Sequence, residues 1–173
     1  MQLSTTMTAR LSKAALASTV GGFAALAAFG NVTDYRTNLS FVRHVLSMDD
    51  QRPELAEVSR IDYRAIRSGR PHHVAYNGVT AVETFIAGSC LRSSWQMLRA
   101  RDGDERTFDE AKNGAILGCT AGLGLWFFGF QGVAGEWFGM WKNEHWNGLP
   151  DAVRLCNYLS AVLILLNVPE PRP

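Results

Sequence analysis

Long uncharged stretches alternate with strongly charged ones along this chain. The longest uncharged stretch runs from Asn113 to Gly135, about 23 residues, and is bounded by Lys112 and Glu136. At about 1.5 Å rise per residue, a helix of that length crosses the roughly 30 Å hydrocarbon core of a bilayer. The pattern predicts a membrane-spanning helix over about residues 112–136.

Three further apolar segments predict spanning helices over about residues 12–33, 73–96 and 152–168. Glu83 and Arg92 interrupt the second of these, and Arg92 lies near the helix end, where it can reach the headgroups. The fourth begins near Asp151, with Pro150 just before or within its first turn. The sequence therefore predicts an all-α fold, an integral membrane four-helix bundle that forms one membrane domain over residues 1–173.

The first apolar segment has a second interpretation. Arg10 and Lys13, the apolar run and the sequence Ala25-Leu26-Ala27 together resemble a secretory signal peptide with its cleavage site. The apolar run continues beyond that site, from Phe29 to Val32, and is long enough to span the bilayer. This continuation favours an uncleaved spanning helix.

The charged segment of about residues 34–71 is predicted to form a short helical cap in the first extramembrane loop, since long loops without secondary structure are uncommon. Apolar residues recur at helical spacing from Phe41 to Leu46, and Asn38 or Ser40 is the expected N-cap of that helix. A second cap helix is expected from Leu55 to Ile66.

The distribution of Lys and Arg predicts the orientation of the chain in the membrane. Arg10 and Lys13 precede the first helix, and five basic residues lie between Arg92 and Lys112 in or beside the second connection. The first connection holds seven arginines, but long loops follow the positive-inside rule less strictly. We expect a multi-pass protein with a cytoplasmic N-terminus and a cytoplasmic C-terminus.

Composition changes this picture little. Mean hydropathy is −0.04, because apolar and charged residues are segregated rather than scarce. The net charge of +1 gives no reason to expect nucleic acid as a partner.

Cys90, Cys119 and Cys156 lie in or beside apolar segments without metal-binding spacing and are expected to be unpaired. The sequence contains no nucleophilic triad, phosphate loop, haem attachment motif or dinucleotide fingerprint, so no enzyme activity and no bound cofactor are predicted beyond lipid.

Glu83 is the first candidate functional residue. A carboxyl group inside an apolar helix is costly and normally faces the bundle interior with a partner. It is then either a proton-relay or ligand-binding acid, or a hydrogen-bonded residue that fixes helix packing. Asn113, Asn157 or a Ser or Thr is the expected partner in the second case.

Aromatic and histidine residues mark the ends of the helices. Glu136, Trp137 and Trp141 follow the third apolar segment, and Trp favours the membrane–water interface, so this group is expected to anchor the protein at a fixed depth. Glu136 is expected to pair with Arg36, Arg43 or a histidine of the cap. The four histidines, His44, His72, His73 and His145, lack the spacing of a metal or haem site, and no metal ligand is predicted.

Small residues on the third helix predict close helix packing. Gly114, Gly118 and Gly122 recur at intervals of four and so lie on one face of an α-helix. Such faces allow two helices to approach closely in lipid. The pattern leaves open whether the partner helix belongs to the same chain.

Several motifs resemble a bacterial family of predicted small integral membrane proteins, a four-helix membrane domain of unknown function. The resemblance covers about residues 10–168 and rests on the segments Asn31 to Tyr35, Thr37-Asn38, Phe41 to Asp49, Glu83, Gly129-Phe130, Gly135 to Phe138, Met140-Trp141 and Trp146 to Gly148. It implies a four-helix membrane protein and no particular activity. We expect the protein to lie in the bacterial inner (cytoplasmic) membrane. Many of these residues fall on the expected outer face, and the candidate functional or docking residues there are Asp34, Tyr35, His44, Met48, His73, Glu136, Trp137 and Trp141.

Three hypotheses for function follow. The first is an accessory subunit of a larger membrane complex, of respiratory or photosynthetic type, with the lipid bilayer and other membrane protein subunits as partners and with any quinone or haem held by those subunits. The second is a small transporter or ligand-binding membrane protein that uses Glu83. The third is an outer-face metal or quinone redox module that uses Glu136 and His44, His72 or His73.

Overall fold

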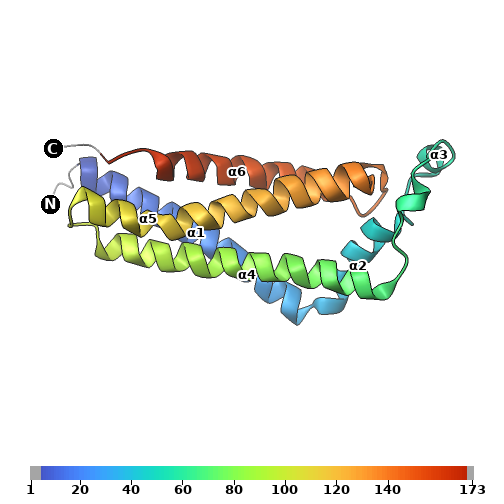
Figure 1. Ribbon diagram of the computed structural model, residues 1–173, viewed down its shortest axis with the longest axis horizontal. Coiled ribbons are helices and arrows are strands. Elements are labelled where there is room, and N and C mark those ends of the chain that lie inside the picture. The colour runs from blue at the N-terminus through green and yellow to red at the C-terminus, as the bar shows by residue number, and fades with distance from the viewer. Residues whose placement is uncertain (1–4, 171–173) are drawn as a thin grey trace.

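The computed structural model describes residues 5–170, and helices make up most of them. Four long helical elements run side by side as a bundle (Figure 1). They are α1 (Thr5–Thr33), α4 (Gly69–Arg99), α5 (Glu105–Leu123) with its continuation η2 (Gly124–Trp137), and α6 (Leu149–Asn167). No strand occurs within residues 5–170, and the all-α prediction is confirmed.

A small helical cap closes one end of the bundle, which we call the cap end. It comprises α2 (Tyr35–Ser47), α3 (Pro53–Ala56) and the 3₁₀-helices η1 (Asp62–Arg64) and η3 (Met140–Lys142). Both described chain ends lie at the opposite end, which we call the terminal end (Figure 1).

The helices within the cap differ from the sequence prediction. α2 begins at Tyr35, before the predicted N-caps Asn38 and Ser40, because the Tyr35 ring already packs edge-on against Tyr76 of α4, with ring centroids 4.8 Å apart. The segment predicted as a helix from Leu55 to Ile66 contains only the end of α3 and the short η1. Ile61 and Ile66 pack against the apolar core of the cap, so the chain follows that core instead of forming one helix.

The bundle is built around α4, which packs along α1 on one side and along α5 on the other. The core between them consists mainly of small side chains, such as Ala14, Ala17, Cys90, Ala115 and Cys119, all of which are buried. Small side chains let helix backbones approach closely, which is how helices associate in lipid.

The glycine face of α5 meets α4 and α6 of the same chain. A Cβ atom at Gly118 would overlap Cys90 Sγ and lie 2.7 Å from Ser89 Oγ, and one at Gly114 would lie 3.0 Å from the Ser89 carbonyl oxygen. A Cβ at Gly122 would lie 2.8 Å from Leu159 Cδ1 of α6. The question that the sequence left open is answered for this face, since both partner helices belong to this chain.

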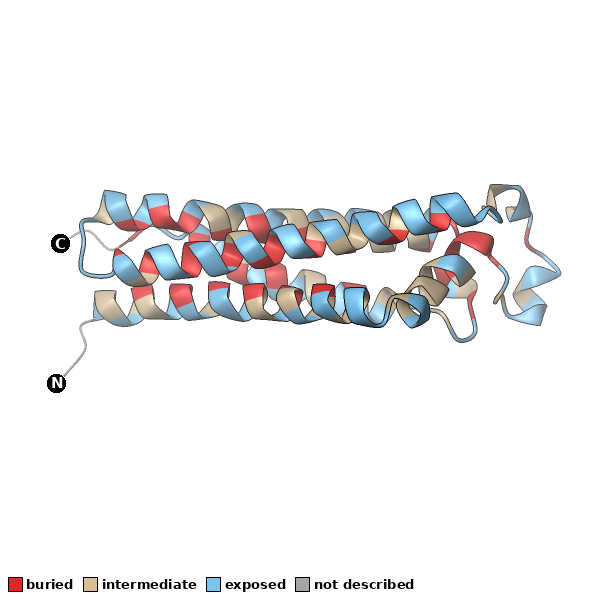
Figure 2. Cartoon of the chain, turned by 90° about the horizontal axis from the view of Figure 1, so that it is seen from below, coloured by how far each residue is buried: buried red, intermediate tan, exposed pale blue. Residues whose placement is uncertain are grey.

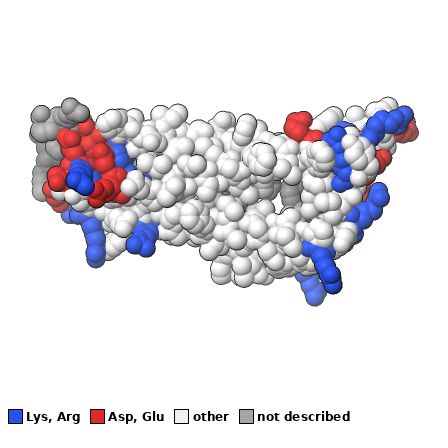
Figure 3. Space-filling view, viewed as in Figure 1, with Lys and Arg blue, Asp and Glu red and all other residues white. Residues whose placement is uncertain are grey.

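The outside of the bundle is apolar between its two ends. Buried residues face the interior, whereas exposed ones cover the outer surface (Figure 2). Charged side chains gather at the cap end and at the terminal end, and the band between them is uncharged on the visible face (Figure 3). Among the described residues, three elements are long and apolar enough to cross a membrane: α1, α5 with η2, and α6. The exposed apolar side chains are therefore suited to contact lipid.

The second half of the third apolar stretch is a π-helix. α5 continues without a break into η2, whose end is closed by Phe138 N–H donating to Val133 O at 3.1 Å, five residues back. π-helical turns are rare and frequently occur at functional sites. The apolar pattern predicted a helix here but does not distinguish the π form from the α form.

Substitution at Gly118 tests the close packing. Gly118→Ala is expected to destabilise the protein by about 1–3 kcal/mol, because the added methyl group overlaps Cys90 and Ser89. The matched control is Gly88→Ala on α4, where a Cβ meets no atom within 4 Å and the better helix former is expected to add about 0.5–1 kcal/mol. Thermal unfolding in mild detergent measures both, and equal midpoints would contradict the packing described here.

Candidate functional site

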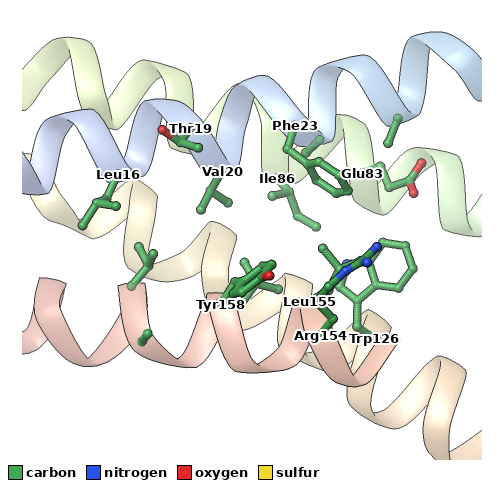
Figure 4. Close-up of a pocket in the computed structure, with 15 residues that line it drawn as sticks. Leu16, Thr19, Val20, Phe23, Glu83, Ile86, Trp126, Arg154, Leu155 and Tyr158 are labelled. Carbon is green, nitrogen blue, oxygen red and sulfur yellow. The ribbon is translucent and has the colours of Figure 1, made fainter. Parts of the chain in front are cut away.

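A cavity of about 670 Å³ lies inside the apolar band. Its walls come from α1, α4, η2 and α6 (Figure 4). It exists because α1 and α6 lie close together at the terminal end and diverge toward the cap end (Figure 1). Its volume falls within the range of about 300–1,000 Å³ that is common for small-molecule sites.

Most of the cavity wall is apolar. Small residues on α1 and α6, among them Ala24, Ala27 and Ala161, leave the space open, and larger side chains surround it. Phe23 of α1 and Tyr158 of α6 line the cavity and are 50% and 62% exposed, so the cavity opens sideways between these two helices. In a bilayer, that opening faces lipid.

Glu83 of α4 is buried and lines the cavity. Its Oε2 accepts a hydrogen bond from Asn31 Nδ2 at 2.6 Å, and Tyr76 Oη donates to the Asn31 carbonyl oxygen at 2.6 Å. The predicted partners Asn113 and Asn157 do not hold it. Within residues 5–170, Oε1 of Glu83 has no hydrogen-bond partner, and no cation pairs with the carboxyl group.

Two further polar side chains lie across the cavity from Glu83, Arg154 of α6 and Trp126 of η2 (Figure 4). Arg154 also pairs with Asp151, at 2.8 Å between Nη2 and Oδ1, and this pair is exposed. The opposite end of the cavity, near Leu16 and Val162, is apolar. The cavity therefore has one polar end and one apolar end.

The candidate cap residues form two separate groups rather than one site. In the first group, Tyr35 Oη lies 2.7 Å from His73 Nδ1 and donates to Asn77 Oδ1 at 3.2 Å. In the second group, His44 Nδ1 lies 2.7 Å from Asp49 Oδ1, and the His44 ring stacks on Trp146 with centroids 4.9 Å apart.

The remaining candidate residues of the cap either lie in its apolar core or are exposed. Met48 is buried in the core of the cap and has a left-handed backbone, with φ 54°. Trp137 and Trp141 are exposed, and the Arg64 guanidinium lies 4.5 Å from the Trp137 ring centroid. Asp34 is exposed and precedes α2 without a side-chain capping bond.

Glu136 is exposed, and the ion pair expected with Arg36, Arg43 or a histidine is not found in the described part of the chain. The same residues contain no group of three or more His, Cys, Asp or Glu side chains placed to hold a metal ion. The described residues therefore provide no ligand cluster for the metal form of the outer-face redox hypothesis.

Sequence reasoning missed the contact that ties the two cap loops together. The Asp50 carboxylate accepts from the backbone N–H of His145 at 2.7 Å and of Trp146 at 3.0 Å, and its other oxygen lies 3.0 Å from His145 Nδ1. Partial burial opposes the charge of Asp50, but these hydrogen bonds outweigh it and lower the pKa of Asp50. The hydrogen bond and charge of Asp50 raise the pKa of His145. The two residues are 95 positions apart, and no local pattern links them.

The sequence matches one protein family. Residues 9–169 match the model of a family described as a predicted small integral membrane protein (DUF2165). The chain belongs to this family. It is therefore a small integral membrane protein, and the resemblance seen in the sequence motifs is confirmed. No curated protein and no solved structure shows a significant match.

The Asp50–His145 contact is expected to make the cap of this family member sensitive to pH. The lowered pKa of Asp50 adds stability that is present above its ordinary value of 3.8 and is lost as pH falls through the lowered pKa. The raised pKa of His145 adds stability that is present below 6.5 and is lost as pH rises through the raised pKa. The contact is thus expected to be strongest between about pH 4 and 6.5.

Hydrogen exchange of the His145 and Trp146 amides, corrected for intrinsic rates, measures this dependence. Protection is expected to fall at alkaline pH in the wild type. His145→Gln is expected to remove that alkaline step, whereas Asp50→Asn is expected to lower protection throughout. A wild-type protection factor that is constant from pH 5 to pH 9 would contradict the assignment.

Proposed function

We propose that this protein binds an uncharged, single-chain amphiphile that enters the cavity sideways from the bilayer. The observation that carries the proposal is an apolar cavity that opens between α1 and α6 and has a buried carboxyl group at one end only. Binding sites are commonly apolar cavities with a few polar groups that fix ligand orientation. This develops the ligand-binding hypothesis derived from Glu83.

The two ends of the cavity favour one orientation of the ligand. Glu83 and Arg154 lie toward the cap end, whereas Leu16 and Val162 lie toward the terminal end. A ligand whose headgroup lies at Glu83 places its hydrocarbon chain along α1 and α6, where the wall of the cavity is apolar. The reverse orientation would bury a polar headgroup against aliphatic side chains, which is costly.

The chemistry of Glu83 supports an uncharged headgroup. A charged side chain at the centre of a spanning helix costs roughly 2.5–3.5 kcal/mol. Asn31 supplies no opposite charge, and Arg154, across the cavity, pairs with Asp151 instead. An uncharged carboxyl group both donates and accepts hydrogen bonds. It therefore suits a hydroxyl, ester or other carbonyl headgroup better than a quaternary or primary amine.

Membership of a larger membrane complex is a compatible proposal that rests on the small size of the chain and on its lack of catalytic motifs. A bacterial inner-membrane location with both termini cytoplasmic is part of the same proposal. The position of both described chain ends at one end of the bundle supports a common side for the termini (Figure 1). Mass spectrometry of proteins that co-purify in mild detergent tests the partner, and purification without any stoichiometric partner would count against it.

Filling the cavity tests the binding proposal. Ala27→Phe places a ring in the cavity and is expected to weaken binding of monoolein, an uncharged single-chain amphiphile, on the order of tenfold. The matched control is Ala81→Phe, on an exposed position of α4 outside the cavity, which is expected to leave binding unchanged. Native mass spectrometry at several monoolein concentrations measures occupancy, and equal occupancy of both variants and wild type would overturn the proposal.

Substitutions at Glu83 test the headgroup. Glu83→Gln retains a donor and an acceptor and is expected to bind monoolein within about twofold of wild type, whereas Glu83→Leu is expected to bind on the order of tenfold more weakly. Oleylamine serves as the charged comparison. Tighter binding of oleylamine than of monoolein, lost in Glu83→Gln, would show that Glu83 acts as an ionised partner of a cation and would refute the uncharged headgroup.

A further inference from the structure

Three basic side chains meet one carboxylate at the terminal end of the bundle. Arg10 and Lys13 come from the first turns of α1, Lys112 comes from α5, and Glu170 lies three residues beyond the end of α6. All four are buried, with 3–6% of their surface exposed. None of them lines the cavity, so this cluster is independent of the proposed ligand site.

The C-terminal segment is held to the bundle by these cations. Lys13 Nζ donates to Glu170 Oε1 at 2.5 Å and to the Val168 carbonyl oxygen at 2.8 Å. Lys112 Nζ also reaches the Val168 carbonyl oxygen, at 3.5 Å, and pairs with Asp109 at 2.6 Å. The segment after α6 thus contacts these cations through one side chain, that of Glu170, and one backbone carbonyl, that of Val168.

The Glu170 carboxylate lies at different distances from the three cations. Only Lys13 contacts it at hydrogen-bond distance, whereas Arg10 Nε lies 3.5 Å away and Lys112 Nζ lies 3.7 Å away. Arg10 Nε and Glu170 Oε2 are both buried without a hydrogen-bond partner among the described residues. Arg10 Nη1 instead donates to the carbonyl oxygens of Arg101 and Gly103, at 2.8 and 2.7 Å. The single charge of Glu170 thus faces three cations, of which Lys112 has a second carboxylate partner, Asp109.

A phosphate monoester fits the same three cations better. It has three strong acceptor oxygens and a charge of about −1.5 to −2 at pH 7. Arg and Lys are the residues that proteins use to bind phosphate. Charged side chains gather at the terminal end, beside the uncharged band (Figure 3). A bilayer that covered this band would place its headgroups at that end.

We propose that Arg10, Lys13 and Lys112 form a phosphate-binding site at the membrane face of the terminal end, and that Glu170 occupies it in the absence of ligand. A phosphate monoester, carried by a lipid such as phosphatidic acid or free in solution, displaces Glu170 and releases the C-terminal segment from α1 and α5. Glu170 is then an internal competitor rather than a permanent partner.

Removing the competitor tests the proposal. Glu170→Gln is expected to raise the occupancy of short-chain phosphatidic acid in native mass spectrometry on the order of tenfold over wild type. Lys13→Gln in the Glu170→Gln background is expected to remove the gain. Glu110→Gln, an exposed carboxyl change at the same end of the bundle, is the matched control and is expected to bind as wild type does. Phosphatidylcholine of the same chain length measures binding that does not depend on a monoester.

A second measurement uses the wild-type chain and so does not depend on how the variants fold. Hydrogen exchange at Asn167, Val168 and Glu170 is expected to accelerate in nanodiscs when phosphatidic acid replaces phosphatidylcholine. Acceleration by inorganic phosphate alone supports the same site and assigns the soluble form as its ligand. Unchanged exchange with both phosphates, or equal occupancy of wild type and Glu170→Gln, would overturn the proposal and leave Glu170 as a structural contact.

Discussion

The close approach of α1 and α5 to α4 is the constraint on which the rest of the structure depends. The hydrophobic effect does not drive helices together in lipid. Close packing of the backbones and hydrogen bonds between helices must therefore hold them together. Glycines provide the contact, and Ser93 and Ser94 of α4 donate to carbonyl oxygens of α5 and α1 at 2.5 Å and 2.8 Å. Because these interfaces hold α1, α4 and α5 together, α6 can diverge from α1, and that divergence creates the cavity.

Polar groups inside the apolar band follow one rule. Each must find a partner within the protein, because lipid offers none. Tyr76, Asn31 and Glu83 form one such chain of bonds from α4 to α1 and back. This series of hydrogen bonds ends at the Glu83 carboxyl group, which lies beside the cavity. A ligand in the cavity can supply the hydrogen-bond partner that Oε1 of Glu83 lacks within the described residues. At the terminal cluster, a basic group is left incomplete in a similar way, since Arg10 Nε is buried without a hydrogen-bond partner among the described residues.

The periodic features of the chain could be predicted from its sequence, whereas contacts between distant segments could not. The uncharged stretch from Asn113 to Gly135 identified a spanning helix, and the spacing of Gly118 with its neighbours identified a packing face, because both signals are local. Glu83 was recognised as a buried acid from its apolar surroundings. Its partner Asn31 was not, because 52 residues separate them and several amides were equally plausible from composition. Glu170 stood in a Pro-rich tail that gave no sign of contact with α1.

The cavity itself had no sequence signal at all, for a physical reason. A cavity is the space that remains after helices of given side-chain size adopt their crossing angles, and Ala27 or Ala161 looks the same in sequence whether it meets a neighbouring helix or faces a gap. Only the divergence of α1 from α6 distinguishes the two cases. The terminal cluster holds α1 and the segment after α6 together one helical turn beyond Leu16, where the cavity ends. Release of Glu170 would loosen the end at which these helices now converge, so the anion site and the cavity share the α1–α6 interface even though they share no residue.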